Sequence, residues 1–308
     1  MIIPKRCIVI DCPTIDLNQL KPSLQKLCFR ECKKSQEESW GFFAFDELGD
    51  SEELLHTVDR FTVINLRHDH KKLNKTKLSR AWRKELKKQE DAAGMVFDKP
   101  KREQVREEVK AKLFEQKEPD ESYIKAVHDS IKNRLYILVS APASAEFFAE
   151  KFSQALSEQN QSLSFKADTL QPELTETLTN WLYKPGASEE NGYIVGEDMM
   201  LKGEDSSTAT LKKQEADSAE IRELLHARKQ VQKLHLRTRD DQDQEVSFVI
   251  SNTRILSQID LKGICDSQCK AEKDNHTDVA ALKDAELLIW FAALSDLCDK
   301  VKEIPVGE

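Results

Sequence analysis

Glycine is scarce in this sequence, and the placing of the few glycines excludes the common phosphate-binding loops. There are nine glycines among 308 residues, and the closest two are Gly192 and Gly196. A dinucleotide-binding fingerprint needs glycines two residues apart, and a Walker A loop needs Gly followed by Lys, because the backbone must approach phosphate closely there. Neither pattern is present, and the Gly-x-Ser-x-Gly and His-Glu-x-x-His motifs of hydrolases are absent too. We therefore predict no catalytic residue and no cofactor.

Long apolar segments are also absent. No apolar run approaches the roughly 18 to 20 residues that a membrane-spanning helix needs. The apolar residues at the start of the chain are too few and too interrupted by charge for a signal peptide. We expect a cytoplasmic protein with no membrane partner.

The cysteines are too few for a disulfide scaffold. Seven of them are spread over the chain, an odd number that is typical of reduced thiols in a cytoplasm. Two pairs have a three-residue gap, Cys28/Cys32 at the end of a helix expected over 17–32, and Cys265/Cys269. Structural zinc sites usually have tighter spacings with Gly or turn residues nearby. We expect half-buried helix thiols at both places and predict no metal site.

The negative net charge conceals a strongly basic segment. The formal net charge is −8, yet residues 67–88 hold ten Lys and Arg against Asp69 and Glu85, so this window carries +8 and the remainder −16. A second basic window, residues 225–239, holds five Lys and Arg and no acid. Acidic proteins that keep such segments often bind a polyanion there. The alternative is a solvated helix face.

Two narrow apolar stripes lie within residues 71–118, on otherwise charged segments. Each stripe has three members four residues apart: Leu78, Trp82 and Leu86, and then Val105, Val109 and Leu113. Stripes of this width are closer to a coiled-coil seam than to the wide apolar face of a core helix. We predict a projecting antiparallel helical hairpin. Its apex presents Met95, Val96 and Phe97, exposed apolar residues that favour self-association as a dimer contact.

The remainder of the chain alternates short β-branched runs with amphipathic segments, which indicates an α+β protein. The clearest elements are a buried strand over 134–140 and a closing helix over 279–301. We predict mixed sheets with packed helices in three parts. These are a central α+β domain (1–70 and 119–173), the helical tip (71–118) and a separate α+β base domain (174–308).

A hydrolase using His68, Asp69 and His70 is one competing interpretation. His68 and His70 share one face of a strand and could both bind a metal ion. No third ligand is evident from the sequence, so solvated histidines in a basic segment are the preferred explanation.

Several segments resemble those of one protein family in order and spacing. Leu178-Thr-Asn-Trp-Leu182 is similar to a Leu-Thr-x-Trp-Leu/Val element, and Asn191-Gly-Tyr-Ile-Val-Gly-Glu-Asp198 to Gly-Phe-x-Leu-Gly-Asp-Glu. Thr210-Leu-Lys-Lys-Gln-Glu215 resembles a basic Arg-x-Lys/Arg-Lys/Arg-Gln-Asp motif. These elements belong to the recombination-associated RdgC proteins of bacteria. Because the resemblance covers most of the chain in order, the chain resembles a divergent member of that family.

The resemblance implies a two-fold homodimer closed into a ring, with one contact at the tip and another between the base domains. It implies that duplex DNA passes through a basic channel, that binding has no sequence preference, and that RecA-promoted recombination is restrained. It implies no cofactor and a nucleoid-associated location in the cytoplasm. Whether single-stranded DNA is also bound stays open.

The expected DNA contacts come from two sources. The basic motif carries over Lys212, Lys213, Gln214 and Lys229, and Arg228 adds a charge where the family has glycine. The basic hairpin segment adds seven more: Lys71, Lys72, Lys75, Lys77, Arg80, Arg83 and Lys84. Lys and Arg at these positions would neutralise phosphates and release counterions, without reading the bases.

The chain departs from the family at an aromatic gate residue. Lys112-Leu-Phe-Glu-Gln-Lys-Glu-Pro-Asp120 replaces the family's Leu-Leu-Pro-Arg-Ala-Phe, so the gate residue has no direct counterpart, and Tyr123 and Phe114 are the two candidates for its place. A second competing interpretation is a protein-interaction module. In that case the helical hairpin docks a recombination or replication protein and DNA is not needed.

Overall fold

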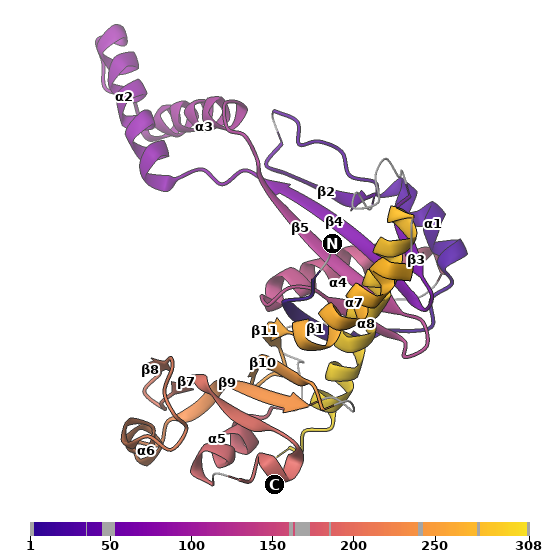
Figure 1. The fold of residues 1–308 in the computed structure, drawn as a ribbon. Coiled ribbons are helices and arrows are strands. Elements are labelled where there is room, and N and C mark those ends of the chain that lie inside the picture. Colours follow the sequence, from indigo (N-terminus) through magenta and orange to yellow (C-terminus); the bar gives the residue numbers. More distant parts are fainter. Residues whose placement is uncertain are drawn as a thin grey trace. The chain divides into compact units, whose positions relative to one another are not determined.

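A computed structural model gives the fold of the chain (Figure 1). The residues it describes are 3–34, 36–44, 53–159, 163, 173–184, 186–239, 243–275 and 278–306. The helices are α1 (Leu17–Lys26), α2 (Lys75–Ala93), α3 (Lys99–Glu115), α4 (Pro142–Leu156), α5 (Thr175–Tyr183), α6 (Ala219–His226), α7 (Lys262–Asn275) and α8 (Val279–Lys302). The strands are β1 (Arg6–Asp11), β2 (Glu38–Phe43), β3 (Leu55–Val58), β4 (Phe61–His70), β5 (Asp120–Asp129), β6 (Arg134–Ile137), β7 (Ile194–Lys202), β8 (Thr208–Leu211), β9 (Gln230–Arg239), β10 (Glu245–Ser251) and β11 (Leu256–Asp260).

The chain divides into two compact units, and strands β4 and β5 each run from one unit into the other. Unit 1 comprises Met1–Ser23, Ala44–Ile64 and Lys125–Glu308. Unit 2 comprises Leu24–Phe43 and Asn65–Ile124. The three-part division expected from the sequence stays a prediction, and most residues near its boundary at 173, namely 164–172, lie outside the described part of the chain.

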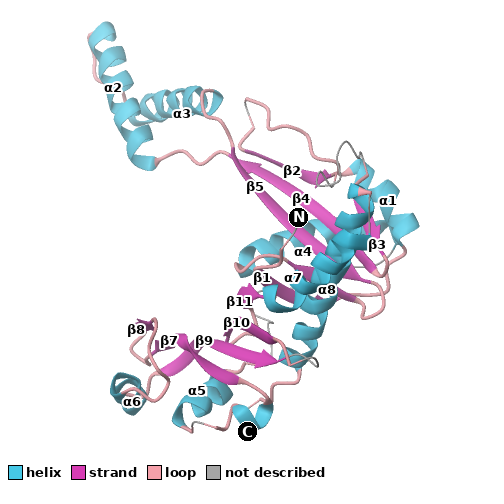
Figure 2. Ribbon diagram, in the orientation of Figure 1, coloured by secondary structure: helices cyan, strands magenta, loops and turns pink. Residues whose placement is uncertain are grey.

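Unit 1 is built on an antiparallel sheet, whose strands are drawn in magenta in Figure 2. Its strand order in unit 1 is β3-β4-β5-β6-β1-β11-β10-β9-β7-β8, with β4 and β5 each contributing the part that lies in this unit. Short connections such as residues 130–133 and 252–255 force antiparallel neighbours, because a parallel pair needs a crossover of a dozen or more residues. The α+β class is confirmed, but the expectation of mixed sheets is wrong: the sheet is antiparallel.

Helices cover this sheet and enclose the core of unit 1. Helix α5 packs on β9, α7 packs on β10, and α8 packs on α7 and β3. Trp290, Phe291 and Leu294 of α8 are buried together with Phe248 and Leu234 of the sheet. The predicted closing helix is confirmed as α8. The predicted strand over 134–140 is confirmed but ends at Ile137.

Unit 2 joins the short strand β2 to helices α2 and α3. Strand β2 pairs with β4 in an antiparallel register that sets Glu38 opposite His70 and Phe43 opposite Asn65. Residues 71–74 connect β4 to α2, and residues 116–119 connect α3 to β5. In Figure 1 the two helices lie beyond the ends of β4 and β5.

The helix expected over 17–32 ends early, at Lys26. The backbone N–H of Phe29 donates to the carbonyl of Phe42 at 2.8 Å, so the chain there runs beside β2. Gly41 permits this contact, since a Cβ atom at this position would lie 2.3 Å from the Phe29 backbone. The exposed Cys28 and half-buried Cys32 are therefore not helix thiols. Cys265 and Cys269 do lie on a helix, α7, as expected, but they are buried rather than half-buried.

Candidate nucleic-acid interface

Helix α2 is defined at both ends by residues of the sequence. The side chain of Asn74 accepts hydrogen bonds from the backbone N–H groups of Thr76 and Lys77, and so satisfies donors that the first turn leaves unpaired. Gly94 ends the helix in the left-handed conformation, at φ 66°. Asp98 caps the start of helix α3: its side chain accepts from the backbone N–H of Lys101, and Pro100 lies in the first turn.

The two helices pack through the stripes expected from the sequence. Leu78, Trp82 and Leu86 are half-buried on α2, while Val105 and Val109 are buried on α3. The Trp82 indole Nε1 donates to the carbonyl of Arg102 at 3.2 Å, which ties the middle of α2 to α3. No residue of α2 is fully buried, so the helix keeps most of its circumference in solvent. That the pair forms a projecting tip stays a prediction.

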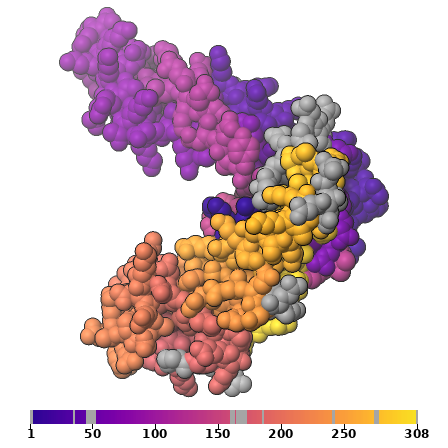
Figure 3. Space-filling model, viewed as in Figure 1, coloured from indigo at the N-terminus to yellow at the C-terminus, as the bar shows by residue number. Residues whose placement is uncertain are grey.

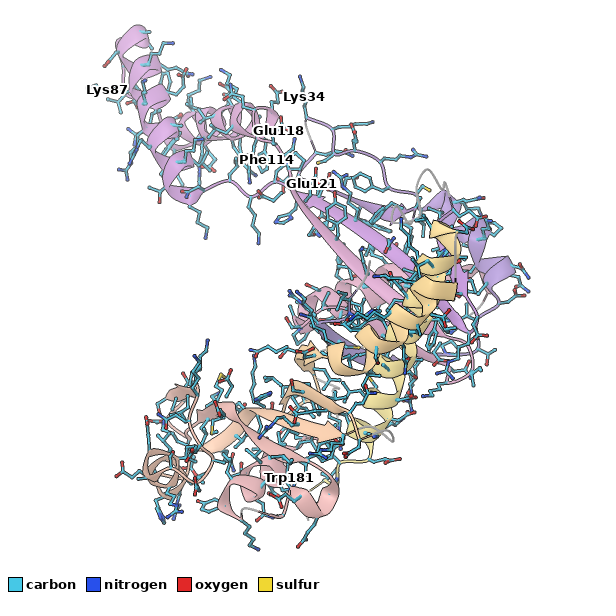
Figure 4. All side chains as sticks on the ribbon, in the orientation of Figure 1. Lys34, Lys87, Phe114, Glu118, Glu121 and Trp181 are labelled. Carbon is cyan, nitrogen blue, oxygen red and sulfur yellow. The ribbon has the colours of Figure 1, made fainter. Side chains whose placement is uncertain are left out.

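The outward side of α2 is a continuous basic surface, which we call the α2 basic face. Its six members are all exposed: Lys77, Arg80, Arg83, Lys84, Lys87 and Lys88. At about 100° of rotation per residue they fall within about 140° of the helix circumference, opposite the stripe that contacts α3. Figure 4 shows Lys87 extending away from α3, and in the space-filling view of Figure 3 no other segment lies over the side of α2 that faces the viewer.

Two members of this face, Lys87 and Lys88, were missed among the expected contact residues. Both lie inside the basic window 67–88, so the sequence held the signal. Placing the window on a helical wheel with Trp82 as the packed position would have found them. Lys75 and Lys72 are also exposed, Lys75 in the first turn of α2 and Lys72 before it.

A shallow depression borders the α2 basic face over its first two to three turns. It is lined by Lys75, Thr76, Ser79, Arg80 and Arg83. The two hydroxyl groups can donate hydrogen bonds and the cations supply charge, so the lining matches what a phosphate group accepts. All five residues come from α2, which makes the depression a property of this helix alone.

Lys71 does not belong with the exposed cations. Only 6% of its surface is accessible, and its ammonium group donates to the carbonyls of Lys33, Lys34 and Phe114 at 3.1 to 3.4 Å. Figure 4 labels Lys34 and Phe114 on the two segments that it joins. A buried cation that donates to three carbonyl groups is not free to contact phosphate, so Lys71 does not belong among the expected DNA contacts.

The motif residues of unit 1 lie in two loops, which we call the base loops: residues 212–214 after β8 and residues 228–229 after α6. Lys212, Lys213 and Arg228 are exposed, and Gln214 is half-buried. Lys213 and Arg228 adopt positive φ angles of 55° and 57°, which turn the chain sharply at each position.

Acidic residues and hydroxyl groups accompany the base loops. The backbone N–H of Lys213 donates to the Asp198 carboxylate at 3.2 Å, and that of Gln214 donates to the carbonyl of Glu197 at 3.1 Å. The Lys229 ammonium donates to the Ser207 carbonyl at 3.3 Å and to its hydroxyl group, next to Asp205. The base loops therefore present mixed charge, unlike the α2 basic face.

The turn between α2 and α3 exposes apolar side chains. Met95 is 63% exposed and Val96 is 71% exposed. Phe97 is half-buried, and its backbone N–H donates to the Glu90 carboxylate at 2.9 Å. Two of the three expected dimer-contact residues thus present their side chains to solvent.

The two aromatic residues considered for the gate have different surroundings. Tyr123 is 50% exposed, stacks edge-on against Phe43 and donates its hydroxyl proton to Glu121 at 2.6 Å, which raises the tyrosine pKa. Phe114 is half-buried beneath the Lys110 ammonium, 5.7 Å from the ring centre. Which of them substitutes for the family's gate residue stays open.

The His68, Asp69 and His70 side chains do not converge. The two histidine rings stack at 5.4 Å on one face of β4, as alternation along a strand predicts. Asp69 is buried and is held by Arg67 through two hydrogen bonds of 2.8 and 3.0 Å. Hydrogen bonding to Asp69 is the main cause that raises the pKa of Arg67. The two histidines therefore contact each other, while the Asp69 carboxylate pairs with Arg67, and the three side chains do not form one site.

No group of three or more His, Cys, Asp and Glu side chains that could hold a metal ion occurs within the residues that the structure describes. None of the helices described there is both long enough and apolar enough to cross a membrane.

Comparison with known proteins gives two matches. The family model described as "Putative exonuclease, RdgC" matches residues 8–308. A relative from Pseudomonas syringae pv. tomato (strain ATCC BAA-871 / DC3000), named "Recombination-associated protein RdgC", is 21% identical over 294 residues. That match covers 95% of this chain and 92% of the relative. The identity is low, but the match to the family model includes residues of both units.

Proposed function

This chain belongs to the RdgC family, and we propose that it is a recombination-associated protein that binds duplex DNA through phosphate contacts without sequence preference. The observation that carries the proposal is the α2 basic face, with six exposed cations on one side of one helix. Duplex DNA is a dense line of negative charge, so each phosphate that a cation neutralises releases counterions and strengthens binding.

We further propose a homodimer that encloses the DNA as a ring, with the helical tip and the base domain each meeting its counterpart. Family membership and the exposed Met95 and Val96 support this assembly, because identical contacts at two ends of a protomer close a two-fold ring. A ring on the duplex would restrain RecA-promoted recombination by occupying DNA in the nucleoid. Exclusion of this kind needs no bond to be broken.

Fluorescence anisotropy tests the DNA-binding proposal. A labelled random-sequence duplex is titrated with the protein at 50 and 200 mM salt. Six or more phosphate contacts predict an affinity loss of roughly 10³-fold between these concentrations. If no binding occurs at 50 mM salt, the proposal fails and the protein-interaction interpretation replaces it.

Removal of the helical tip separates the two interpretations further. A variant in which a short Gly-Ser linker replaces residues 76–118 should lose most of its DNA affinity. A protein-interaction module would instead keep its DNA affinity and lose only a protein partner. Circular dichroism and thermal unfolding of the remaining chain show whether it is folded.

Sedimentation tests the dimer contact. The double substitution Met95→Asp and Val96→Asp places charge on the apex, so self-association should weaken if this surface is an interface. Ile131→Asp is a matched control, because Ile131 is an exposed apolar residue of unit 1 (69% accessible) in a different turn. Equal sedimentation of all three proteins at all concentrations would contradict an interface at the apex.

The family description names an exonuclease, and a direct assay decides whether this chain is one. End-labelled linear duplex is incubated with excess protein and Mg²⁺ or Mn²⁺. Binding by exclusion predicts intact DNA, together with inhibition of RecA-promoted strand exchange that rises with the amount of protein bound. Progressive release of nucleotides would replace exclusion with catalysis.

A further inference from the structure

We infer that α2 lies lengthwise in the major groove of B-form DNA, with two rows of cations on its outward side contacting the two sugar-phosphate backbones. This inference rests on the proposed DNA binding and goes beyond it, because it names the form of nucleic acid that the site selects.

The α2 basic face consists of two rows. Arg80, Arg83 and Lys87 form the first row, and Lys77, Lys84 and Lys88 form the second. At about 100° per residue the centres of the rows are separated by about 90° around the helix. The rows thus form two shoulders on a cylinder about 10–12 Å wide, and the major groove of B-DNA is about 12 Å wide.

The opposite side of α2 is closed to DNA by α3. The stripe containing Trp82 packs on α3, and Glu85 lies on that side, hydrogen-bonded by Gln89 at 3.1 Å. That hydrogen bond, with the charges of Lys88 and Lys112, lowers the pKa of Glu85. The only acid on the basic face itself is Asp91, in the last turn. The two rows therefore flank a surface without negative charge along most of the helix.

The rows differ in chemistry. The first row contains both arginines, and Arg80 and Arg83 also line the depression that contains the hydroxyl groups of Thr76 and Ser79. Guanidinium and hydroxyl donors together can hold one phosphate by several directed hydrogen bonds. The second row is all lysine, and lysine contacts phosphate as a point charge. If α2 contacted only one sugar-phosphate strand of the duplex, one row of cations would be sufficient.

Seating in the major groove has a consequence that charge alone does not have. An A-form RNA duplex has a narrow, deep major groove that does not admit a helix, although its charge density is similar. Single-stranded DNA has no second backbone opposite the first. We therefore expect B-form DNA to be preferred over a double-stranded RNA of the same sequence and over single-stranded DNA.

The experiment compares three proteins with three ligands. The first-row variant is Arg80→Gln, Arg83→Gln and Lys87→Gln, and the second-row variant is Lys77→Gln, Lys84→Gln and Lys88→Gln. Gln keeps a similar helix propensity. Lys99→Gln, Lys101→Gln and Lys112→Gln is the control, since these three lysines are exposed on α3. Each is titrated against labelled DNA duplex, RNA duplex and single-stranded DNA over a series of salt concentrations.

The slope of log K against log salt is negative. Groove binding predicts that each row variant reduces the magnitude of this slope on duplex DNA by about 2.7, since each of the three lost phosphate contacts accounts for about 0.9. The control should leave the slope unchanged, and wild-type protein should bind duplex DNA at least 10-fold more tightly than either other ligand. A slope change in one row variant alone, or equal affinity for DNA and RNA duplexes, overturns groove seating while DNA binding stands. If the wild-type protein binds none of the three ligands, the proposed function itself fails, which is a different outcome from the failure of groove seating.

Discussion

The α2 basic face and the base loops show how differently two basic regions of one molecule can be built. The base loops contain the residues that resemble a family motif, but acids accompany them: the Lys213 backbone N–H donates to the Asp198 carboxylate, and the Lys229 ammonium lies near Asp205. The α2 basic face lies outside the segments that resemble the family's motifs. Its six cations are nevertheless exposed together on one side of a helix. The resemblance to the family's motif therefore points to the base loops, whereas the concentration of positive charge points to the α2 basic face.

The difference teaches that a phosphate-binding surface is decided by what surrounds each cation. Lys229 and Lys71 are both basic and both were expected to contact DNA, but each ammonium group already donates to oxygen atoms of the protein. Moving such a cation to a phosphate would break those bonds, whereas an exposed cation on α2 exchanges only water and counterions. We expect DNA affinity to depend mainly on α2.

Neutralising the whole α2 basic face should have the largest effect on DNA affinity. Replacing all six cations with Gln is expected to lower the salt slope by about 5 and to weaken duplex binding at least 10³-fold at low salt. The helix content measured by circular dichroism should stay the same. If the slope changes by less than 1, α2 is not the main contact surface.

Neutralising the base loops should have a smaller effect. Lys212→Gln with Lys213→Gln removes at most two phosphate contacts, so the salt slope should fall by no more than about 1.8. The neighbouring acids reduce the contribution further. A larger loss than that of the six α2 substitutions would reverse the comparison and favour the motif as the principal site.

Removing an acid from the base loops should strengthen DNA binding slightly. Asp198→Asn keeps an oxygen atom that can accept from the Lys213 N–H but removes the negative charge. An exposed charge pair is typically worth about 0.2–1 kcal/mol, so the gain in affinity should be about 1.4- to 5-fold. Asp266→Asn, an exposed acid of α7, is the control and should show no gain. Equal gains in both variants would mean that net charge, not the base loops, is responsible.

Lys71→Met should have the smallest effect on the salt slope and a clear effect on folding. It removes the charged donor of three part-buried hydrogen bonds, to the carbonyls of Lys33, Lys34 and Phe114, which costs about 1–3 kcal/mol of unfolding free energy. Urea unfolding measures the loss, and anisotropy on the folded fraction should give the wild-type slope. A reduced slope in folded Lys71→Met would return Lys71 to the DNA-contacting set.

Much of the fold follows from local patterns in the sequence, and long-range contacts explain the misses. The stripes of Trp82 and Val105 predict α2 and α3 because the helical period is a local property. The early end of α1 could not be predicted, since it depends on Phe29 pairing with Phe42 across Gly41. The antiparallel sheet depends likewise on which strands become neighbours.

The candidate site, like the fold, was predictable where it depends on local patterns and not where it depends on long-range contacts. Exposed cations of α2 such as Arg80 and Lys84 were expected from charge and period alone. The burial of Lys71 was not, because its three acceptors come from segments 37 to 43 residues away in the chain. No local pattern distinguishes this lysine from its exposed neighbour Lys72.

Lysine acetylation footprinting of the unmodified protein tests the central claim most directly. The protein is treated with a limiting acetylating reagent, with and without a saturating random-sequence duplex, and each lysine is quantified by mass spectrometry. We predict strong protection of Lys77, Lys84, Lys87 and Lys88, weaker protection of Lys212 and Lys213, none of Lys99 or Lys101, and little reaction of buried Lys71 in either sample. Unchanged reactivity of the four α2 lysines in the presence of bound DNA would contradict the account.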